Sequence, residues 1–348
     1  MKKLSVVLAC ALLVMSLIAC NNEQAVQNKN VTASNSDKED VLTEEVSQDI
    51  NETLVKHSFI SGEQALDVLA AEDDYTSKLS IFDYNSKFQS DHVLDEAGRK
   101  VVLEDHVLEW NDSQMKSVDQ AMANINEKFA NFDIDMPEIT FILTADKDEG
   151  GAAYTRGTSI ILKSHSVYKH SLDLEHLIVH EMFHVYSRAY KDFRPDMYAV
   201  IGYSQCEELA WPKELVDLKI SNPDAPDNNF YIRGTYKDIE YDFMPIIYSS
   251  ESYEVGSGQS FFSTLQDKFL AVEVVDGVPN PIYLSDELLI VSKNSINEFY
   301  DKVGRNTDYT YHPEETMADN FVFMIYQVDV KSPFVVEGLN KIINGKNE

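Results

Sequence analysis

The sequence predicts an α+β fold, in which helices and a small mixed sheet share one core. Three observations support this prediction. Apolar side chains recur on one helical stripe in residues 113–129, and Ile139–Thr144 is a run of β-branched and aromatic residues typical of a strand. Residues 171–188 return to a helical pattern that is apolar around most of its circumference. Such a pattern indicates a helix buried in the core.

The first residues are typical of an export signal. Lys2 and Lys3 precede an apolar run, residues 4–19, that is too short to favour spanning a bilayer. The run ends in Leu17-Ile18-Ala19-Cys20, which resembles a bacterial lipobox, where the cysteine becomes the lipidated first residue of the mature chain. We therefore expect a lipoprotein signal peptide at residues 1–19 and a lipid anchor at Cys20, with the alternative of an ordinary signal peptide. The chain would then lie in a bacterial cell envelope, facing the periplasm or the exterior.

Composition limits the possible partners and the source of stability. Residues 20–51 are rich in polar and acidic residues, which predicts a disordered tether. Beyond the signal and the lipid anchor only Cys206 remains, so stability must come from a hydrophobic core and not from disulfides. The formal net charge of -30 repels phosphate backbones, and we expect no nucleic acid partner.

Two further regions follow the tether. We expect residues 52–110 to form an N-terminal helical preface, with amphipathic helices at 62–72 and 75–88. Packing against the core is the favoured role of this preface, and covering a cleft is the alternative. Residues 111–348 would form the main domain, with an inserted lobe at about 196–300 and a mostly helical C-terminal part. The positions expected to be buried in the preface are Leu66, Val68, Leu69, Leu79, Ile81, Phe82 and Phe88.

The main domain is expected to begin with a helix at 113–129, opened by a cap at Asn111, Asp112 or Ser113. Strands should follow at 139–144, 152–155 and 158–162, the second of them at an edge of the sheet. The elements expected further on are a long helix at 171–188, a hairpin of 230–236 and 240–247, a strand at 269–275, and helices at 295–303 and from Pro313.

The helix at 171–188 carries the strongest chemical signal, His180-Glu181-Met182-Phe183-His184. Residues four apart lie one above the other on a helix, so one metal ion can bridge both imidazoles, with Glu181 beside it. A zinc ion in such a site lowers the pKa of a water molecule, and the carboxylate can accept that water's proton. The spacing therefore predicts a hydrolytic zinc centre. His176 also lies on this face, but one ion cannot reach three imidazoles spread over two turns.

The third metal ligand must come from elsewhere in the chain. A histidine six residues after His184 is excluded, because that position is Tyr190. Glu315 is the best candidate, since Pro313 suits the first turn of a helix on which Glu315 and Asp319 lie on one face. Glu314, by contrast, is expected to be a solvated first-turn glutamate. The alternative third ligand is Glu207 or Glu208.

The pairing of this helix with the His-Glu-x-x-His helix resembles the gluzincin arrangement. The resemblance implies that Glu315 binds zinc and that Asp319 holds the outer nitrogen of His180. Segments near 221–226, 303–307 and 312–315 are also similar to those of a group of bacterial zinc peptidases, over residues 110–335. The resemblance implies a zincin-like fold: a small mixed sheet, with an antiparallel edge strand, over the active-site helix. About 130 residues separate His184 from Glu315, far more than in thermolysin-like gluzincins.

These patterns lead to one functional hypothesis and two alternatives. We expect a zinc metallopeptidase in which Glu181 is the general base. An extended peptide could add to the edge strand, and the alternative is that this strand belongs to an ordinary hairpin with no binding role. The oxyanion donor is expected at Tyr311 or His312, with Tyr248 as a further candidate. The alternatives are a non-catalytic zinc-binding surface lipoprotein and a zinc amidase that acts on cell-wall amides.

Overall fold

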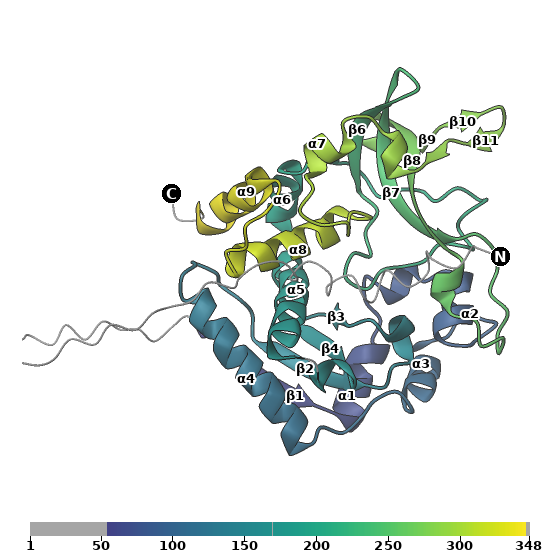
Figure 1. Cartoon of the computed structure of the whole chain (residues 1–348). Coiled ribbons are helices and arrows are strands. Elements are labelled where there is room, and N and C mark those ends of the chain that lie inside the picture. The colour runs from purple at the N-terminus through teal and green to yellow at the C-terminus, as the bar shows by residue number, and fades with distance from the viewer. Residues whose placement is uncertain (1–53, 169, 346–348) are drawn as a thin grey trace, which may run out of the picture.

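Two main sheets, with helices between and around them, make up the part of the chain that the computed structural model describes, residues 54–168 and 170–345 (Figure 1). The expected α+β class is confirmed. The predicted signal peptide, Cys20 and the whole predicted tether lie outside the described residues. No helix in these ranges is long and apolar enough to cross a membrane.

The first sheet has four strands in the order β1-β2-β4-β3. Strands β1, β2 and β4 run parallel, and β3 pairs antiparallel with β4 at one edge. The strands expected near 139–144, 152–155 and 158–162 are therefore confirmed, including the edge position of the second. The bounds are β1 His57–Ile60, β2 Ile139–Thr144, β3 Tyr154–Arg156 and β4 Ser159–Lys163.

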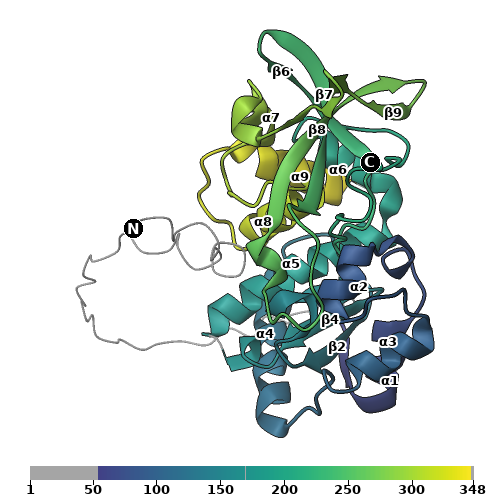
Figure 2. The ribbon, with the colours of Figure 1, turned by 90° about the vertical axis from the view of Figure 1, so that its right-hand side faces the viewer.

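Strand β2 is apolar along most of its length because helices cover both faces of the sheet. Phe141 and Leu143 belong to the main core, which also contains α4 and α5, whereas Ile142 packs in a second cluster with α1, α2 and α3. Side chains alternate between the faces of a strand, so neighbouring residues enter different cores. Figure 2 shows α1–α3 and α4 around this sheet.

Helix α5 lies between the first sheet and α8, and most of its residues are buried (Figure 1). Helix α4 begins as expected, with Asn111 and Gln114 forming a reciprocal capping box. The helix bounds are α1 Gly62–Ala70, α2 Ile81–Lys87, α3 Glu96–Leu103, α4 Asp112–Phe129, α5 Ser171–Ala189, α6 Arg194–Ala199, α7 Phe299–Val303, α8 Pro313–Ile325 and α9 Pro333–Asn344. Short 3₁₀ helices lie at Thr76–Lys78, Asp148–Gly151, Ser166–Tyr168, Lys191–Phe193, Phe261–Ser263 and Lys293–Ser295.

The second sheet is antiparallel, in the order β12-β8-β7-β6-β5, with β9 also pairing with β8. Its β6–β7 hairpin and strand β8 confirm the hairpin and the strand expected there. This sheet falls within the range expected for the inserted lobe, whose limits remain a prediction. The bounds are β5 Tyr203–Gln205, β6 Phe230–Tyr236, β7 Ile239–Ser249, β8 Leu265–Val275, β9 Val278–Pro281 and β12 Ile290–Val291, and β10 Tyr283–Leu284 pairs with β11 Glu287–Leu288.

The N-terminal preface differs from the sequence prediction in three ways. It contributes strand β1 to the first sheet, whereas only helices were expected there. The helix expected at 75–88 is interrupted, because Ser80 caps a new helix through the backbone N–H of Asp83. Ile81, expected to be buried, is 40% exposed at the start of that helix.

The helix expected at 295–303 is also shorter in the structure. It is reduced to α7, because Glu298 has a left-handed backbone conformation.

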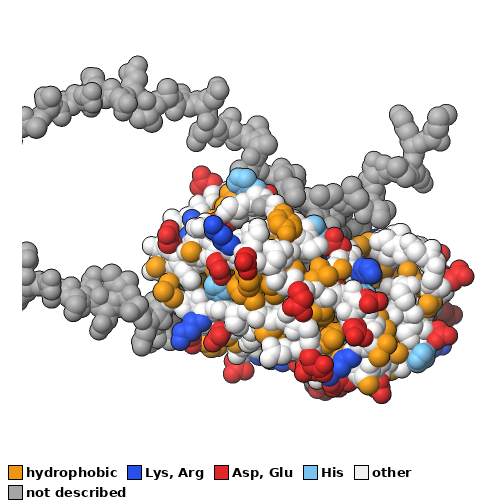
Figure 3. Space-filling model, turned by 90° about the horizontal axis from the view of Figure 1, so that it is seen from below, with side chains coloured by type: hydrophobic (Ala, Val, Ile, Leu, Met, Phe, Trp, Pro, Cys, Tyr) orange, Lys and Arg blue, Asp and Glu red, His pale blue; other side chains and the backbone are white. Residues whose placement is uncertain are grey.

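The surface seen from below carries acidic side chains spread over the whole face (Figure 3). Lysine and arginine side chains are interspersed with them, and no patch of one sign dominates this view. Charges of both signs that are interspersed in this way reduce the tendency of protein molecules to associate.

Candidate metal centre

Helices α5 and α8 bring together the three residues predicted to bind a metal. Glu315 Oε2 lies 3.2 Å from His180 Nε2 and 3.5 Å from His184 Nε2. Glu315 is in the first turn of α8, which Pro313 opens at the first helical position. The pairing of distant helices therefore agrees with the sequence prediction, across 135 residues between His180 and Glu315.

The spacing of these atoms suits a zinc ion. Zinc bonds of about 2.0 to 2.1 Å in a tetrahedral site place ligand atoms about 3.3 to 3.5 Å apart. The two nitrogen–oxygen distances given above, 3.2 and 3.5 Å, match that separation, and the potential ligand atoms of His180, His184 and Glu315 all lie within 4.8 Å of one another. The three residues could thus hold one ion and leave a fourth position open.

The outer nitrogen of His180 has the partner that the sequence predicted. His180 Nδ1 lies 2.9 Å from Asp319 Oδ1, and Thr307 Oγ1 donates to Asp319 Oδ2 at 2.5 Å. A carboxylate on Nδ1 fixes the orientation of the ring and directs the Nε2 lone pair towards a metal. Thr307 therefore fixes the position of the Asp319 carboxylate.

Glu314 corrects the sequence prediction, because it is buried and not solvated. Its Oε1 lies 3.0 Å from His184 Nδ1, so it holds His184 as Asp319 holds His180. Its Oε2 accepts hydrogen bonds from Ser187, at 2.7 Å, and from the Tyr198 hydroxyl. The sequence carried no signal for this role, because the burial of Glu314 depends on how α8 packs in the fold.

Electrostatic interactions in the centre favour an ionised carboxylate between two imidazoles. Burial by itself lowers the pKa of His180, but hydrogen bonds to Asp319 and Glu315 outweigh it and raise the pKa to about 10. Burial also acts to raise the pKa of Glu315, but the charge of His184 and the hydrogen bonds from both imidazoles hold it well below its usual value.

Glu181 points into the same space from α5. Its Oε2 is buried, and among the described residues it has no hydrogen-bond partner. Burial, together with the nearby charge of Asp224, raises the pKa of Glu181 to about 8. A buried carboxylate oxygen without a partner is costly unless a water, an ion or a ligand satisfies it. This oxygen is therefore available for a bound molecule.

Part of the loop that joins β5 to β6 lies against the centre. We call residues 221–227 the covering segment. Asn222 Nδ2 donates to Glu315 Oε1 at 2.6 Å, and so it holds the oxygen that does not face the imidazoles. Carboxylate oxygens of Asp224 and Glu181 and a ring nitrogen of His184 all lie within 4.8 Å of one another. The sequence pattern assigned no role to Asp224, because nothing in a turn-rich segment indicates where it docks.

The rival third ligands lie elsewhere. Glu208 accepts a hydrogen bond from the backbone N–H of Asn228 at 3.0 Å and forms an ion pair with Lys78 at 3.2 Å. Glu207 is exposed. His176 stacks edge-on against Tyr326, with ring centroids 4.3 Å apart, which agrees with the expectation that it is not a ligand.

The candidate oxyanion donors occupy different positions. His312 caps α8, where its Nδ1 accepts from the backbone N–H of Glu314 at 3.1 Å, so this nitrogen already has a partner. The Tyr311 hydroxyl donates to the Tyr309 hydroxyl at 2.8 Å. The ring of Tyr309, which the sequence analysis did not single out, lies 6.0 Å from the ring of His180. Tyr248 packs against the apolar cluster of the second sheet.

Comparisons of this chain with protein-family models, with curated proteins and with solved structures find no match.

Proposed function

We propose that this protein is a zinc-dependent metallopeptidase with a gluzincin-like centre on a zincin-like fold. The observation that carries the proposal is the position of Glu315 Oε2, which faces the Nε2 atoms of both histidines at metal-ligand spacing. Glu181 supports a hydrolytic role, because a purely structural site needs no buried acid beside it and closes its fourth position with a protein ligand.

Each polar residue of the centre has a definite role in this proposal. When bound, a zinc ion would act as a Lewis acid and lower the pKa of a water molecule. Glu181 accepts a proton from the attacking water and passes it to the leaving amine. Asp319 and Glu314 hold the outer nitrogens of the two histidines, and Asn222 holds the outer oxygen of Glu315.

The edge strand β3 suits a peptide substrate. Tyr154–Arg156 pairs with β4 on one side only, so the backbone groups on its outer side can pair with an extended chain. Tyr309 and Tyr311, whose hydroxyls are hydrogen-bonded to each other near His180, are the candidates for the oxyanion donor.

Zinc content and peptide release together test the proposal. Wild-type protein should bind one zinc per chain and release fragments, detected by mass spectrometry, from an unfolded protein substrate. Glu181→Gln should keep its zinc and lose at least about a hundredfold in rate, because general-base catalysis contributes about that much or more. Glu315→Ala should lose zinc as well. Glu208→Ala, which removes an exposed glutamate of the rival pair, should keep both properties.

The alternatives predict different results. Zinc binding with cleavage of cell-wall amides but not of peptides would favour an amidase. Zinc binding with no hydrolysis of either substrate would favour a non-catalytic binding protein. Equal zinc content in Glu315→Ala and the wild type would contradict the proposed centre.

A further inference from the structure

The covering segment occupies the place that a peptide would take in the proposed function. Thr155 is the middle residue of the edge strand β3, and its N–H points away from β4. Asp224 Oδ1 accepts a hydrogen bond from this N–H at 2.7 Å and from Thr155 Oγ1 at 2.6 Å. The group with which an added strand would pair is therefore already bound by the protein itself.

The same segment also reaches the centre between the two helices. Asn222 is hydrogen-bonded to Glu315, and Asp224 lies near Glu181 and His184, as described above. Arg188 of α5 links the edge strand to the covering segment, because its Nη2 donates to Thr155 Oγ1 at 2.9 Å and to the carbonyl oxygen of Pro223 at 3.3 Å. An extended substrate could not reach both the edge strand and Glu181 while these contacts exist.

Residues of the N-terminal preface hold both ends of the covering segment. At one end, the backbone N–H of Ser221 donates to the Asp83 carboxylate at 3.1 and 3.2 Å, and Lys87 Nζ donates to the Ser221 carbonyl at 2.6 Å. At the other end, Asp227 forms an ion pair with Lys78. The preface therefore packs against the core and also holds the covering segment at both of its ends.

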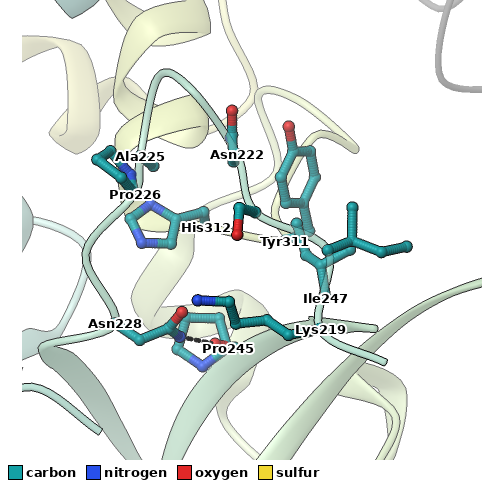
Figure 4. A pocket seen from close by; sticks show the side chains of 11 residues that line it. Lys219, Asn222, Ala225, Pro226, Asn228, Pro245, Ile247, Tyr311 and His312 are labelled. Carbon is teal, nitrogen blue, oxygen red and sulfur yellow. Dashed lines mark hydrogen bonds between the residues drawn. The ribbon is translucent and has the colours of Figure 1, made fainter. Parts of the chain in front are cut away.

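The covering segment is not packed solidly on all sides. It arches over a small pocket, with room for about one or two water molecules, that is lined by His312 and by Pro245 and Ile247 of β7 (Figure 4). Asn222 and Tyr311 lie together at the top of this arch.

We propose that the covering segment is a built-in competitor of the substrate, which the preface holds closed and which must leave the edge strand before an extended peptide can bind. This inference rests on the proposed function. The closed and open forms are two states, and the apparent affinity for a peptide is lowered by the fraction of molecules that are closed. A variant that weakens the closed form should therefore bind an extended peptide more tightly.

Two variants at different places test this inference. Asp224→Ala removes the contact with the edge strand, and Lys78→Ala removes an ion pair that does not touch the centre. Lys100→Ala is the matched control for the second variant, because Lys100 also pairs with two carboxylates, Asp67 and Glu96, but within the preface alone. Asp242→Ala is the matched control for the first, because Asp242 is a buried aspartate that pairs with Arg233 in the second sheet.

The probe is an extended peptide hydroxamate that chelates zinc, with binding to the zinc-loaded protein measured by calorimetry. Asp224→Ala should bind it about tenfold more tightly than the wild type, since each hydrogen bond lost from the closed form contributes modestly to its stability. Lys78→Ala should show a smaller gain in the same direction. Both control variants should match the wild type.

Hydrogen exchange gives a readout that requires neither zinc nor activity. Amides of residues 221–227 should exchange faster in both test variants than in their controls, and faster in the wild type when the hydroxamate is bound. Exchange that stays unchanged in both test variants would overturn the inference, as would hydroxamate binding that leaves the segment protected. A protein that binds no zinc would contradict the proposed function, and the exchange comparison would still decide whether the preface holds the segment closed.

Discussion

The two ends of the proposed metal centre differ in how deeply they are buried. At the His184 end, the side chains of His184 and Glu314 are each 1% exposed, and Ser187, Tyr198 and Arg194 surround the carboxylate. At the His180 end, the side chain of His180 is 13% and that of Asp319 is 19% exposed. From this difference we predict a division of roles, in which the first end contributes mainly to the stability of the fold and the second end would adjust the affinity for a metal.

The largest effect on folding should come from the His184 end. Glu314→Ala leaves His184, Tyr198 and Arg194 buried without their shared partner, so the free energy of unfolding should fall by about 3 to 5 kcal/mol. Asp319→Ala should cost only about 1 to 2 kcal/mol, because water reaches the groups that it leaves. Urea unfolding of the metal-free proteins measures both. Equal losses would refute the division of roles.

The affinity for zinc should respond strongly at the His180 end. Asp319→Ala removes the carboxylate on the outer nitrogen of His180, and we expect zinc to bind about 10- to 100-fold more weakly. Competition with a chelator of known affinity measures this loss. Asp329→Ala, at an exposed aspartate beyond the end of α8, is the control and should bind zinc like the wild type. An unchanged affinity in Asp319→Ala would show that ring orientation depends on packing alone.

The dependence on pH should have opposite signs for folding and for metal binding. The pKa of His180 is raised from 6.5 to about 10, so its contribution to the stability of the metal-free protein is complete below pH 6.5 and lost as the pH rises to 10. Zinc must displace that proton, so its affinity should increase over the same range, by up to about tenfold per pH unit for each proton released.

Calorimetry in buffers of different ionisation enthalpy counts the protons released by zinc, and thermal melts of the metal-free protein follow the stability. Asp319→Ala removes the main group that raises the pKa of His180, so both effects should shrink in that variant. Metal binding that releases no protons at pH 8 would contradict the assignment of His180 as a ligand.

The smallest effect should come from the hydroxyl that supports Asp319. Thr307→Val removes one hydrogen bond, and zinc affinity should fall by less than about tenfold. Thr310→Val is a matched control, because Thr310 Oγ1 is buried without a hydrogen-bond partner among the described residues. That control should be neutral or slightly stabilising. A larger loss in Thr310→Val than in Thr307→Val would show that the hydroxyl of Thr307 does not support the centre.

The sequence predicted those parts of the centre that depend on spacing within one helix. His180 and His184 are one turn apart on α5, and Glu315 and Asp319 are one turn apart on α8, so each pair shares a face whatever the rest of the chain does. Glu314 was missed because its role depends on α6, from which Tyr198 and Arg194 approach it. A first-turn glutamate looks the same in sequence whether or not another helix covers it.

Elements of the fold were predictable where a pattern within one segment defines them. Elements that depend on contacts between distant segments were missed. Strand β2 and helix α4 were identified by composition and capping. Strand β1 was missed because four residues form a strand only by pairing with β2, about 80 residues away. The position of Asp224 was missed because a loop docks by shape and hydrogen bonds that no periodic pattern records.

The long separation of the proposed metal ligands would have a consequence for how the protein matures. When the chain is synthesised, His180 and His184 leave the ribosome 135 and 131 residues before Glu315. Two imidazoles alone would hold an ion weakly, so in the proposed centre metal uptake would follow the synthesis of nearly the whole polypeptide and the docking of α8. An ion bound in this way would stabilise only the completely folded protein and would not assist the early steps of folding.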